Sequence, residues 1–183
     1  VKTRDGDEKL PLLVGVVVDC DSAEAKEAVS LVREGELDFL QLHGERAVAS
    51  FLADESLSSL PHYCAVNLAD ERDLDKLEQL RKRGEARILV DAKSGDSIGG
   101  TGIQIAGPLV QQAAASSRLW LAGGIRPENA AQIVRDFAPE LIDVSSGIEA
   151  RPGKKDTEKL LALCRALTEA EAGIPAGNQG SPC

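Results

Sequence analysis

Features that mark several classes of protein are missing from this sequence of 183 residues. No apolar stretch approaches the ~20 residues needed to span a bilayer, and no positively charged start precedes an apolar segment as in a secretory signal. Methionine is absent and the chain begins with Val1, so Val1 is not expected to be the translation start. Positive charge is scarce, with a formal net charge of −9, which argues against nucleic acid because its phosphates require a basic face. We therefore expect a cytoplasmic protein whose partners include neither membrane nor nucleic acid.

Potential metal ligands of the usual kind are also few. The cysteines form no CxxC pair, and His43 and His62 stand far apart in the sequence, so no metal site is expected. The spacing of the cysteines is typical of cytosolic thiols rather than of a disulfide framework. The acidic balance still permits a small phosphorylated ligand, because backbone amides hold phosphate without net positive charge. The cysteines are Cys20, Cys64, Cys164 and Cys183.

Short apolar runs alternate with amphipathic segments along most of the chain. The length suits a single domain, which we place at residues 12–172, between a polar N-terminal segment (1–11) and a tail expected to be disordered (173–183). The pattern predicts strands at 12–18, 38–42, 62–66, 87–90, 119–122 and 141–144. It predicts helices at 23–33, 45–52, 70–82, 108–115, 127–137 and 155–172.

Strict strand–helix alternation indicates an α/β protein with a parallel sheet and right-handed crossovers. An open doubly wound sheet and a closed barrel both satisfy the pattern. A complete eight-unit barrel takes about 250 residues, with about 200 near the minimum. Periodicity alone therefore does not choose between the two.

Glycine and serine gather after the last three predicted strands. In both parallel architectures ligands sit at the carboxyl ends of the strands, where glycine lets the backbone approach an anion closely. Any one of these segments is more simply a tight turn, but three at consecutive strand ends favour a phosphate site. The segments are Gly99-Gly100-Thr101-Gly102, Gly123-Gly124 and Ser145-Ser146-Gly147.

Six ordered motifs make the interpretation specific. They are Gln41-Leu42-His43-Gly44, Leu89-Val90-Asp91-Ala92, Gly99-Gly100-Thr101-Gly102, Leu121-Ala122-Gly123-Gly124-Ile125-Arg126-Pro127-Glu128-Asn129, Asp143-Val144-Ser145-Ser146-Gly147-Ile148-Glu149 and Pro152-Gly153-Lys154-Lys155-Asp156. With them the chain resembles the phosphoribosylanthranilate isomerase family from about Val14 to Leu167. The resemblance implies a (βα)8 barrel of the TIM type, here incomplete, with about six βα units visible.

The resemblance also implies an activity and a set of site residues. The activity is the Amadori rearrangement of N-(5-phosphoribosyl)anthranilate to 1-(2-carboxyphenylamino)-1-deoxyribulose 5-phosphate in tryptophan biosynthesis, without metal or organic cofactor. Asp91 matches the general acid, and Asp143 matches an aspartate that orients or polarises the substrate, although an ion pair at the barrel mouth explains Asp143 nearly as well. The residues that match substrate- or phosphate-binding positions are Gln41, His43, Gly100, Gly102, Gly123, Gly124, Ser146 and Gly147.

The chain departs from the family pattern at its N-terminus. The family begins with a Lys-Ile-Cys-Gly strand whose cysteine is the general base, and its next unit supplies an arginine thought to recognise the anthranilate carboxylate. Neither motif is found here. Cys20 follows the first visible strand and is the one candidate substitute, but Asp19 and Asp21 disfavour its thiolate.

Alternatives therefore remain open. One is a catalytically impaired or non-catalytic phosphate-binding relative. Another is a different ribose-phosphate barrel enzyme, such as indole-glycerol-phosphate synthase or a histidine-pathway isomerase, although the combination of motifs counts against it. A homodimer, or a partner that supplies the missing strands, is also compatible with the sequence.

Overall fold

The computed structural model describes residues 3–4, 8–9, 11–92, 107–115 and 118–172. The chain divides into two compact units. The first unit comprises Val1–Asn67 and Asp75–Leu89, and the second comprises Leu68–Leu74 and Val90–Cys183. None of the described helices is long and apolar enough to cross a membrane.

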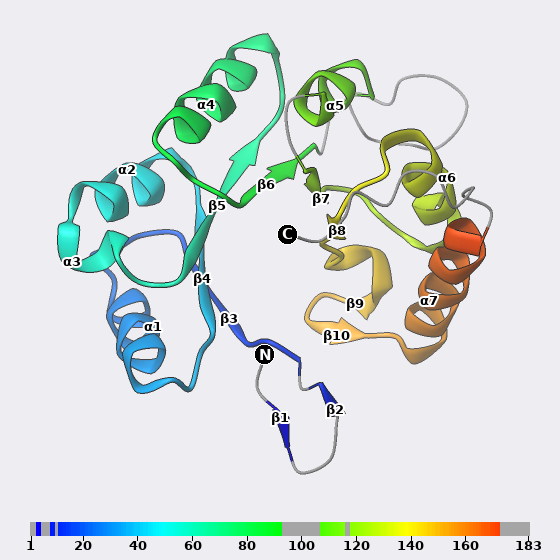
Figure 1. The fold of residues 1–183 in the computed structure, drawn as a ribbon. Coiled ribbons are helices and arrows are strands. Elements are labelled where there is room, and N and C mark those ends of the chain that lie inside the picture. Colours follow the sequence, from blue (N-terminus) through cyan, green and yellow to red (C-terminus); the bar gives the residue numbers. More distant parts are fainter. Residues whose placement is uncertain (1–2, 5–7, 10, 93–106, 116–117, 173–183) are drawn as a thin grey trace. The chain divides into compact units, whose positions relative to one another are not determined.

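A six-stranded sheet is the main feature of the fold, and its strands hydrogen-bond in sequence order, β3-β4-β5-β6-β7-β8 (Figure 1). Strand β6 belongs to both units, because its first residues lie in the first unit and its last in the second. The strands are β3 Val14–Val17, β4 Phe39–His43, β5 His62–Asn67, β6 Ile88–Asp91, β7 Trp120–Ala122 and β8 Leu141–Ile142. The pairings β3–β4, β4–β5 and β7–β8 are parallel, as the alternating pattern predicts.

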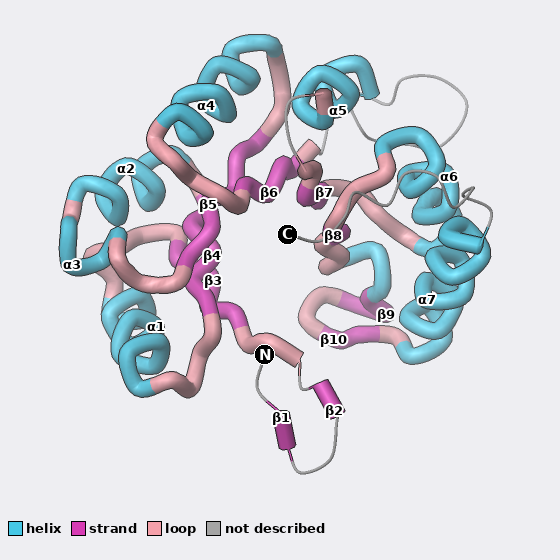
Figure 2. Tube along the Cα trace, in the orientation of Figure 1, coloured by secondary structure: helices cyan, strands magenta, loops and turns pink. Residues whose placement is uncertain are grey.

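Helices follow these strands along the chain, as the cyan and magenta segments of Figure 2 show. They are α1 Ala23–Glu34, α2 Glu45–Ala53, α3 Glu55–Ser58, α4 Glu71–Lys82, α5 Gly107–Ala114, α6 Pro127–Phe137 and α7 Thr157–Ala172. All six predicted strands and all six predicted helices are present, so the α/β class inferred from the sequence is confirmed.

Short elements were not anticipated from the sequence. The segment interpreted as a polar linker contains β1 Thr3–Arg4 paired antiparallel with β2 Glu8–Lys9. A 3-10 turn, η1 Ser146–Ile148, and an antiparallel hairpin of β9 Glu149–Arg151 and β10 Lys154–Lys155 precede the last helix. That helix therefore begins at Thr157 rather than at residue 155. The predicted tail, 173–183, lies outside the described residues.

Helix α1 shows how local sequence sets element boundaries. The hydroxyl of Ser22 accepts a hydrogen bond from the Ala25 amide at 3.0 Å, as expected of an N-cap. Gly35 adopts φ +78° and ends the helix with its amide bonded to carbonyls of the last turn. Gly15 in β3 lets this helix approach the sheet, because a Cβ there would lie 2.9 Å from Leu37 Cδ1 and 3.3 Å from Ala28 Cβ.

The two faces of the first unit's strands differ in burial. Side chains alternate between faces along a strand. Leu40 and Leu42 of β4 are fully buried on one face, whereas Gln41 lies on the other, in register with Val16 of β3 and Tyr63 of β5. The Tyr63 hydroxyl donates to Gln41 Oε1 at 2.9 Å across this second face.

Candidate active site

Two aspartates from the predicted site lie at the ends of β6 and β8, which flank β7 in the sheet. The carbonyl of Asp91, the last residue of β6, accepts from the Leu68 amide at 2.8 Å, and the Ala92 amide donates to Ala122 O at 3.0 Å. The Asp143 amide donates to Leu121 O at 2.8 Å. These bonds hold both aspartates at the carboxyl edge of the sheet, with Asp91 half-buried and Asp143 exposed. With ~4.8 Å between neighbouring strands, their backbones lie roughly 10 Å apart.

The Gly123-Gly124 turn after β7 lies at the same edge. Both residues have positive φ, +99° and +62°, a region that side-chain-bearing residues rarely adopt. Asn129, in the first turn of α6 and only 4% exposed, braces the turn. Its Nδ2 donates to Gly124 O at 3.0 Å and its Oδ1 accepts from the Arg126 amide at 2.9 Å. The turn therefore leads directly into the N-terminus of α6, where the helix dipole favours an anion.

Gly147 brings the loop after β8 against the loop after β7. A Cβ on Gly147 would lie 1.9 Å from the Ile125 carbonyl oxygen and 2.9 Å from the Ile125 carbonyl carbon. No side chain fits at that separation, so the position requires glycine for close approach of two backbones. The predicted phosphate-binding residues Gly123, Gly124, Ser146 and Gly147 thus belong to two loops in direct contact.

Two lysines, Lys155 and Lys159, hold the loop after β8 in place. This contact was not predicted from the sequence. Lys155 Nζ donates to Ser145 O at 2.9 Å and pairs with Glu149 at 3.1 Å. Lys159 Nζ donates to Glu149 O at 2.7 Å. The tether depends on the β9–β10 hairpin, for which Pro152-Gly153 was the available signal, with Gly153 at φ +77° in its turn.

Two predicted binding residues lie in the first unit. Gln41 is half-buried in β4 and accepts the Tyr63 hydrogen bond, and His43 is exposed at the end of that strand. Gly100 and Gly102 lie outside the described residues. The structure therefore groups six of the ten predicted site residues in one unit, namely Asp91, Gly123, Gly124, Asp143, Ser146 and Gly147.

The cysteines do not offer an obvious replacement for the expected base. Burial raises the pKa of the Cys20 thiol, and the neighbouring carboxylates of Asp19 and Asp21 raise it further. The Cys20 thiol donates weakly to Ala47 O at 3.4 Å. Cys64 is completely buried in β5, where burial raises its pKa to about 12, and Cys164 is exposed on α7. All three are free thiols.

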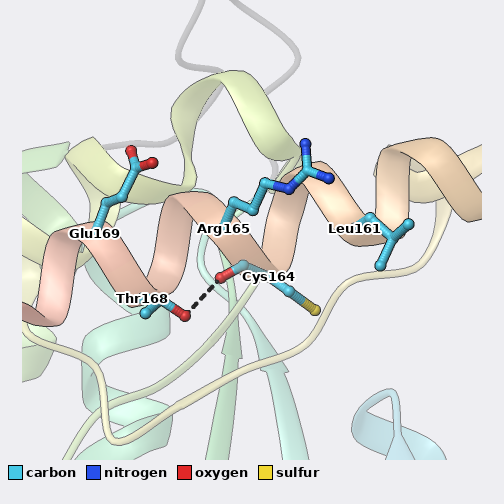
Figure 3. Close-up of a pocket in the computed structure, with 5 residues that line it drawn as sticks. All are labelled: Leu161, Cys164, Arg165, Thr168 and Glu169. Atoms are coloured by element: carbon cyan, nitrogen blue, oxygen red, sulfur yellow. Dashed lines mark hydrogen bonds between the residues drawn. The ribbon is translucent and has the colours of Figure 1, made fainter.

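A surface hollow of about 300 Å³ lies along α7 (Figure 3). Its lining residues are Leu161, Cys164, Arg165, Thr168 and Glu169. The Thr168 hydroxyl is occupied by a hydrogen bond to Cys164 O at 3.0 Å. Since its lining comes from one helix and includes no strand end, this hollow is separate from the candidate site.

Parallel strands, an aspartate at one strand end and contacting glycine loops at the next two define the class of phosphate-binding β/α proteins. The family model for N-(5'-phosphoribosyl)anthranilate (PRA) isomerase matches residues 2–166, so the chain belongs to that family. The match begins closer to the N-terminus than the predicted start near Val14.

Individual relatives agree with the family match. The chain is 32% identical over 164 residues to N-(5'-phosphoribosyl)anthranilate isomerase of Agrobacterium fabrum, covering 88% of this chain and 73% of the relative. It resembles a phosphoribosyl anthranilate isomerase solved with reduced 1-(o-carboxyphenylamino)-1-deoxyribulose 5-phosphate, with a TM-score of 0.65 at 27% identity, covering 88% and 75%. Monomers of the dimeric Thermotoga maritima enzyme give a TM-score of 0.63 at 28% identity, covering 87% and 73%.

Proposed function

We propose that the protein is a phosphoribosylanthranilate isomerase and that the second unit carries its acid and phosphate-binding groups. The reaction is the Amadori rearrangement of N-(5-phosphoribosyl)anthranilate to 1-(2-carboxyphenylamino)-1-deoxyribulose 5-phosphate. The observation that carries the proposal is the contact of Gly147 with the Ile125 carbonyl, beside strand ends that bear Asp91 and Asp143.

The phosphate is assigned to the two contacting loops. Gly123 and Gly124 expose backbone through a turn that most residues cannot adopt, and Ser146 and Gly147 lie on the facing loop. Backbone amides and the N-terminus of α6 supply positive potential without cationic side chains. This arrangement suits a protein with a net charge of −9. Supporting it, the relative solved with a deoxyribulose 5-phosphate has the same fold.

Asp91 is assigned as the general acid. Its proton passes to the furanose ring oxygen as the bond from that oxygen to C1 breaks, and the nitrogen lone pair forms an iminium with C1. A base then removes the proton on C2, and the resulting enolamine tautomerises to the ketone with a proton returned to C1. Asp143, exposed at the same edge of the sheet, orients or polarises the substrate. Gln41 and His43, in the first unit, are assigned as substrate-binding residues from the resemblance to the family.

The general base expected from the family is not identified in this sequence. The Lys-Ile-Cys-Gly motif that carries it in the family does not occur among the 183 residues, and Cys20 has a raised pKa. These observations favour a second candidate function, a phosphate-binding relative that needs further strands before it turns over substrate. A partner chain that supplies such strands is one assembly that we propose, and a homodimer is the other, as in the dimeric Thermotoga maritima relative. Free thiols at Cys20, Cys64 and Cys164 support a cytoplasmic location.

Turnover of freshly generated phosphoribosylanthranilate, followed by loss of its fluorescence, tests the proposal. Asp91→Asn should lower kcat by about 10²–10⁴-fold, the usual contribution of a general acid. Asp136→Asn is the matched control, because Asp136 is an exposed carboxylate on α6. Equal turnover by the two variants would remove Asp91 from the mechanism.

Binding separates the two candidate functions. Absent turnover combined with binding of a product analogue would establish the phosphate-binding relative. Absence of both turnover and binding would contradict both candidates.

A further inference from the structure

Three side chains of types that can ligate a metal ion meet in the first unit. His62 opens β5, Cys64 follows two residues later on the same face of the strand, and Glu85 lies in the turn before β6. One ligand atom from each lies within 4.8 Å of the others. The Cys64 amide donates to Arg87 O at 3.4 Å, which holds this part of β5 beside the approach to β6.

Two oxygen atoms hold the His62 ring in place. Nδ1 lies 2.7 Å from Leu60 O, and Nε2 lies 3.1 Å from Glu85 Oε2. A carbonyl oxygen accepts and cannot donate, so Nδ1 carries a proton. In the neutral ring the Nε2 lone pair then faces a carboxylate. Either a second ring proton or a bound cation relieves that repulsion.

We propose that His62, Cys64 and Glu85 bind one Zn²⁺ ion. Imidazole nitrogen, thiolate and carboxylate are all zinc ligands. A site that combines nitrogen, sulfur and oxygen ligands suits Zn²⁺ because it is a borderline-soft cation. On binding, the Cys64 thiol releases its proton to solvent and forms a sulfur–zinc bond. The thiolate and the Glu85 carboxylate then balance the two positive charges, so the occupied site is neutral. That neutrality matters because the His62 and Glu85 side chains are only 11% and 16% exposed.

The three ligand atoms must move slightly to reach the distances of a zinc site. Zinc bonds of about 2.0–2.3 Å in a tetrahedron place the ligand atoms roughly 3.3–3.6 Å apart. The nitrogen and oxygen already lie 3.1 Å apart, so the main movement is that of the sulfur toward them. Water takes the fourth position. The nearby Arg83 guanidinium, which donates to Leu52 O at 3.3 Å, opposes cation binding and limits its strength.

Because the proposed metal site lies at the amino end of β5, we expect the metal to stabilise the fold rather than take part in catalysis. The His62 ring packs against Phe51 of α2, with ring centroids 5.1 Å apart, on the helix-covered face of the sheet. His62 is also at the amino end of β5, whereas the proposed chemistry uses carboxyl ends. The metal would join the start of β5 to the turn before β6, and the isomerase reaction would remain metal-independent.

Cobalt binding tests the proposal, because Co²⁺ replaces Zn²⁺ and reports thiolate coordination through a near-ultraviolet charge-transfer band. The chain, first freed of metal with a chelator, is expected to bind one equivalent of Co²⁺ with this band and to release it to Zn²⁺. Cys64→Ser should abolish the band, while Cys164→Ser, which changes an exposed cysteine on α7, should retain it. Glu85→Gln, which tests the site without altering the buried thiol, should weaken Zn²⁺ binding by more than about tenfold.

Three results would overturn the site. One is absence of stoichiometric binding by the folded, unmodified chain. Another is a charge-transfer band that survives in Cys64→Ser, since another cysteine would then be the ligand. Circular dichroism of each variant confirms that it is folded, and unchanged Zn²⁺ affinity in folded Glu85→Gln would likewise reject the proposed ligand set. None of these readouts depends on isomerase activity, so the outcome is independent of the proposed function.

Discussion

At Gly147, the absence of a Cβ lets the loops after β7 and β8 contact each other. We expect Gly147→Ala to destabilise the protein by about 1–3 kcal/mol or more, because the added methyl collides with backbone that has no rotamer to change. The same change should weaken phosphate binding by separating the two loops. Chemical denaturation and titration with a product analogue measure the two effects.

Gly107→Ala is the control for this substitution. Its new Cβ would have Phe137 Cζ as its nearest neighbour, at 4.0 Å, and the residue opens α5, where alanine is a better helix former. A Gly147→Ala protein as stable as the Gly107→Ala protein would contradict the close contact.

Cys20 provides a second test at the residue scale. Its thiol pKa lies above the ordinary value of 9.0, mainly through burial and then through Asp19 and Asp21. A raised pKa leaves less thiolate at any pH below it, so alkylation by iodoacetamide at pH 8 should be several-fold slower at Cys20 than at exposed Cys164. Peptide mass spectrometry measures both sites in one sample.

The pH dependence of Cys20 alkylation follows from the direction of this pKa shift. The midpoint of the Cys20 alkylation rate should fall above pH 9.0, and replacing Asp19 and Asp21 together by Asn should lower it. Because burial is the largest cause of the raised pKa and remains in this variant, the midpoint should still lie above pH 9.0. Rapid alkylation of Cys20 at neutral pH would instead restore it as a candidate base.

Among the elements, the β9–β10 hairpin controls the loop that precedes it. Lys155 reaches from β10 to Ser145 O and Glu149. Lys155→Met keeps the aliphatic stem and removes the charge, so the loop loses its tether. An exposed ion pair contributes ~0.2–1 kcal/mol, so the product-analogue Kd should rise by about 1.5- to 5-fold.

Lys154→Met controls for the loss of positive charge, because Lys154 is the exposed neighbour of Lys155 in the same strand. Equal weakening by both substitutions would show that net charge, rather than the tether, governs affinity.

Element boundaries were predictable where a residue has a strong local preference. Helix α6 spans 127–137 as predicted, because Pro127 is preorganised for the first helical position. The start of α7 was predicted two residues early. Asp156 Oδ1 accepts from the amides of Glu158 and Lys159, so it caps the helix and leaves Lys155 to the hairpin.

Site contacts were predictable to the extent that they lie at strand ends. Glycine motifs located the phosphate loops, but the contact of Gly147 with a carbonyl involves no side-chain pattern that a sequence displays. Similarly, histidine and cysteine spacing gave no sign of the cluster at His62, because Glu85 arrives from another element. Asp91, Asp143, Gln41 and His43 keep their assigned roles as proposals.

At the scale of the molecule, the chain spans about three quarters of the relatives it matches, and β3 is the first strand of its sheet. Val16 and Val18 are 60% and 63% exposed, whereas Val17 between them is 2% exposed. Among the described residues β3 is therefore an edge strand with an exposed apolar face, and such strands are prone to associate with other chains. We therefore expect concentration-dependent self-association of this chain in sedimentation velocity.

Two adjacent substitutions in β3 test this expectation. Val16→Lys should suppress association and change stability by no more than about 0.5 kcal/mol, as is usual at an exposed position. Val17→Lys should cost about 3 kcal/mol or more, because it leaves an unpaired charge in the core. Comparable losses of stability from both substitutions would mean that the face of β3 bearing Val16 is covered.

The Gly147 contact also has a consequence for comparative genomics. The atom it meets is a backbone carbonyl, which every residue at position 125 presents in the same way. A change at position 125 therefore calls for no compensating change at Gly147, and no residue at position 125 could make room for a side chain at position 147. Correlated substitutions across homologous genes would carry no trace of this pair, so contact maps inferred from covariation would omit this contact between the two loops.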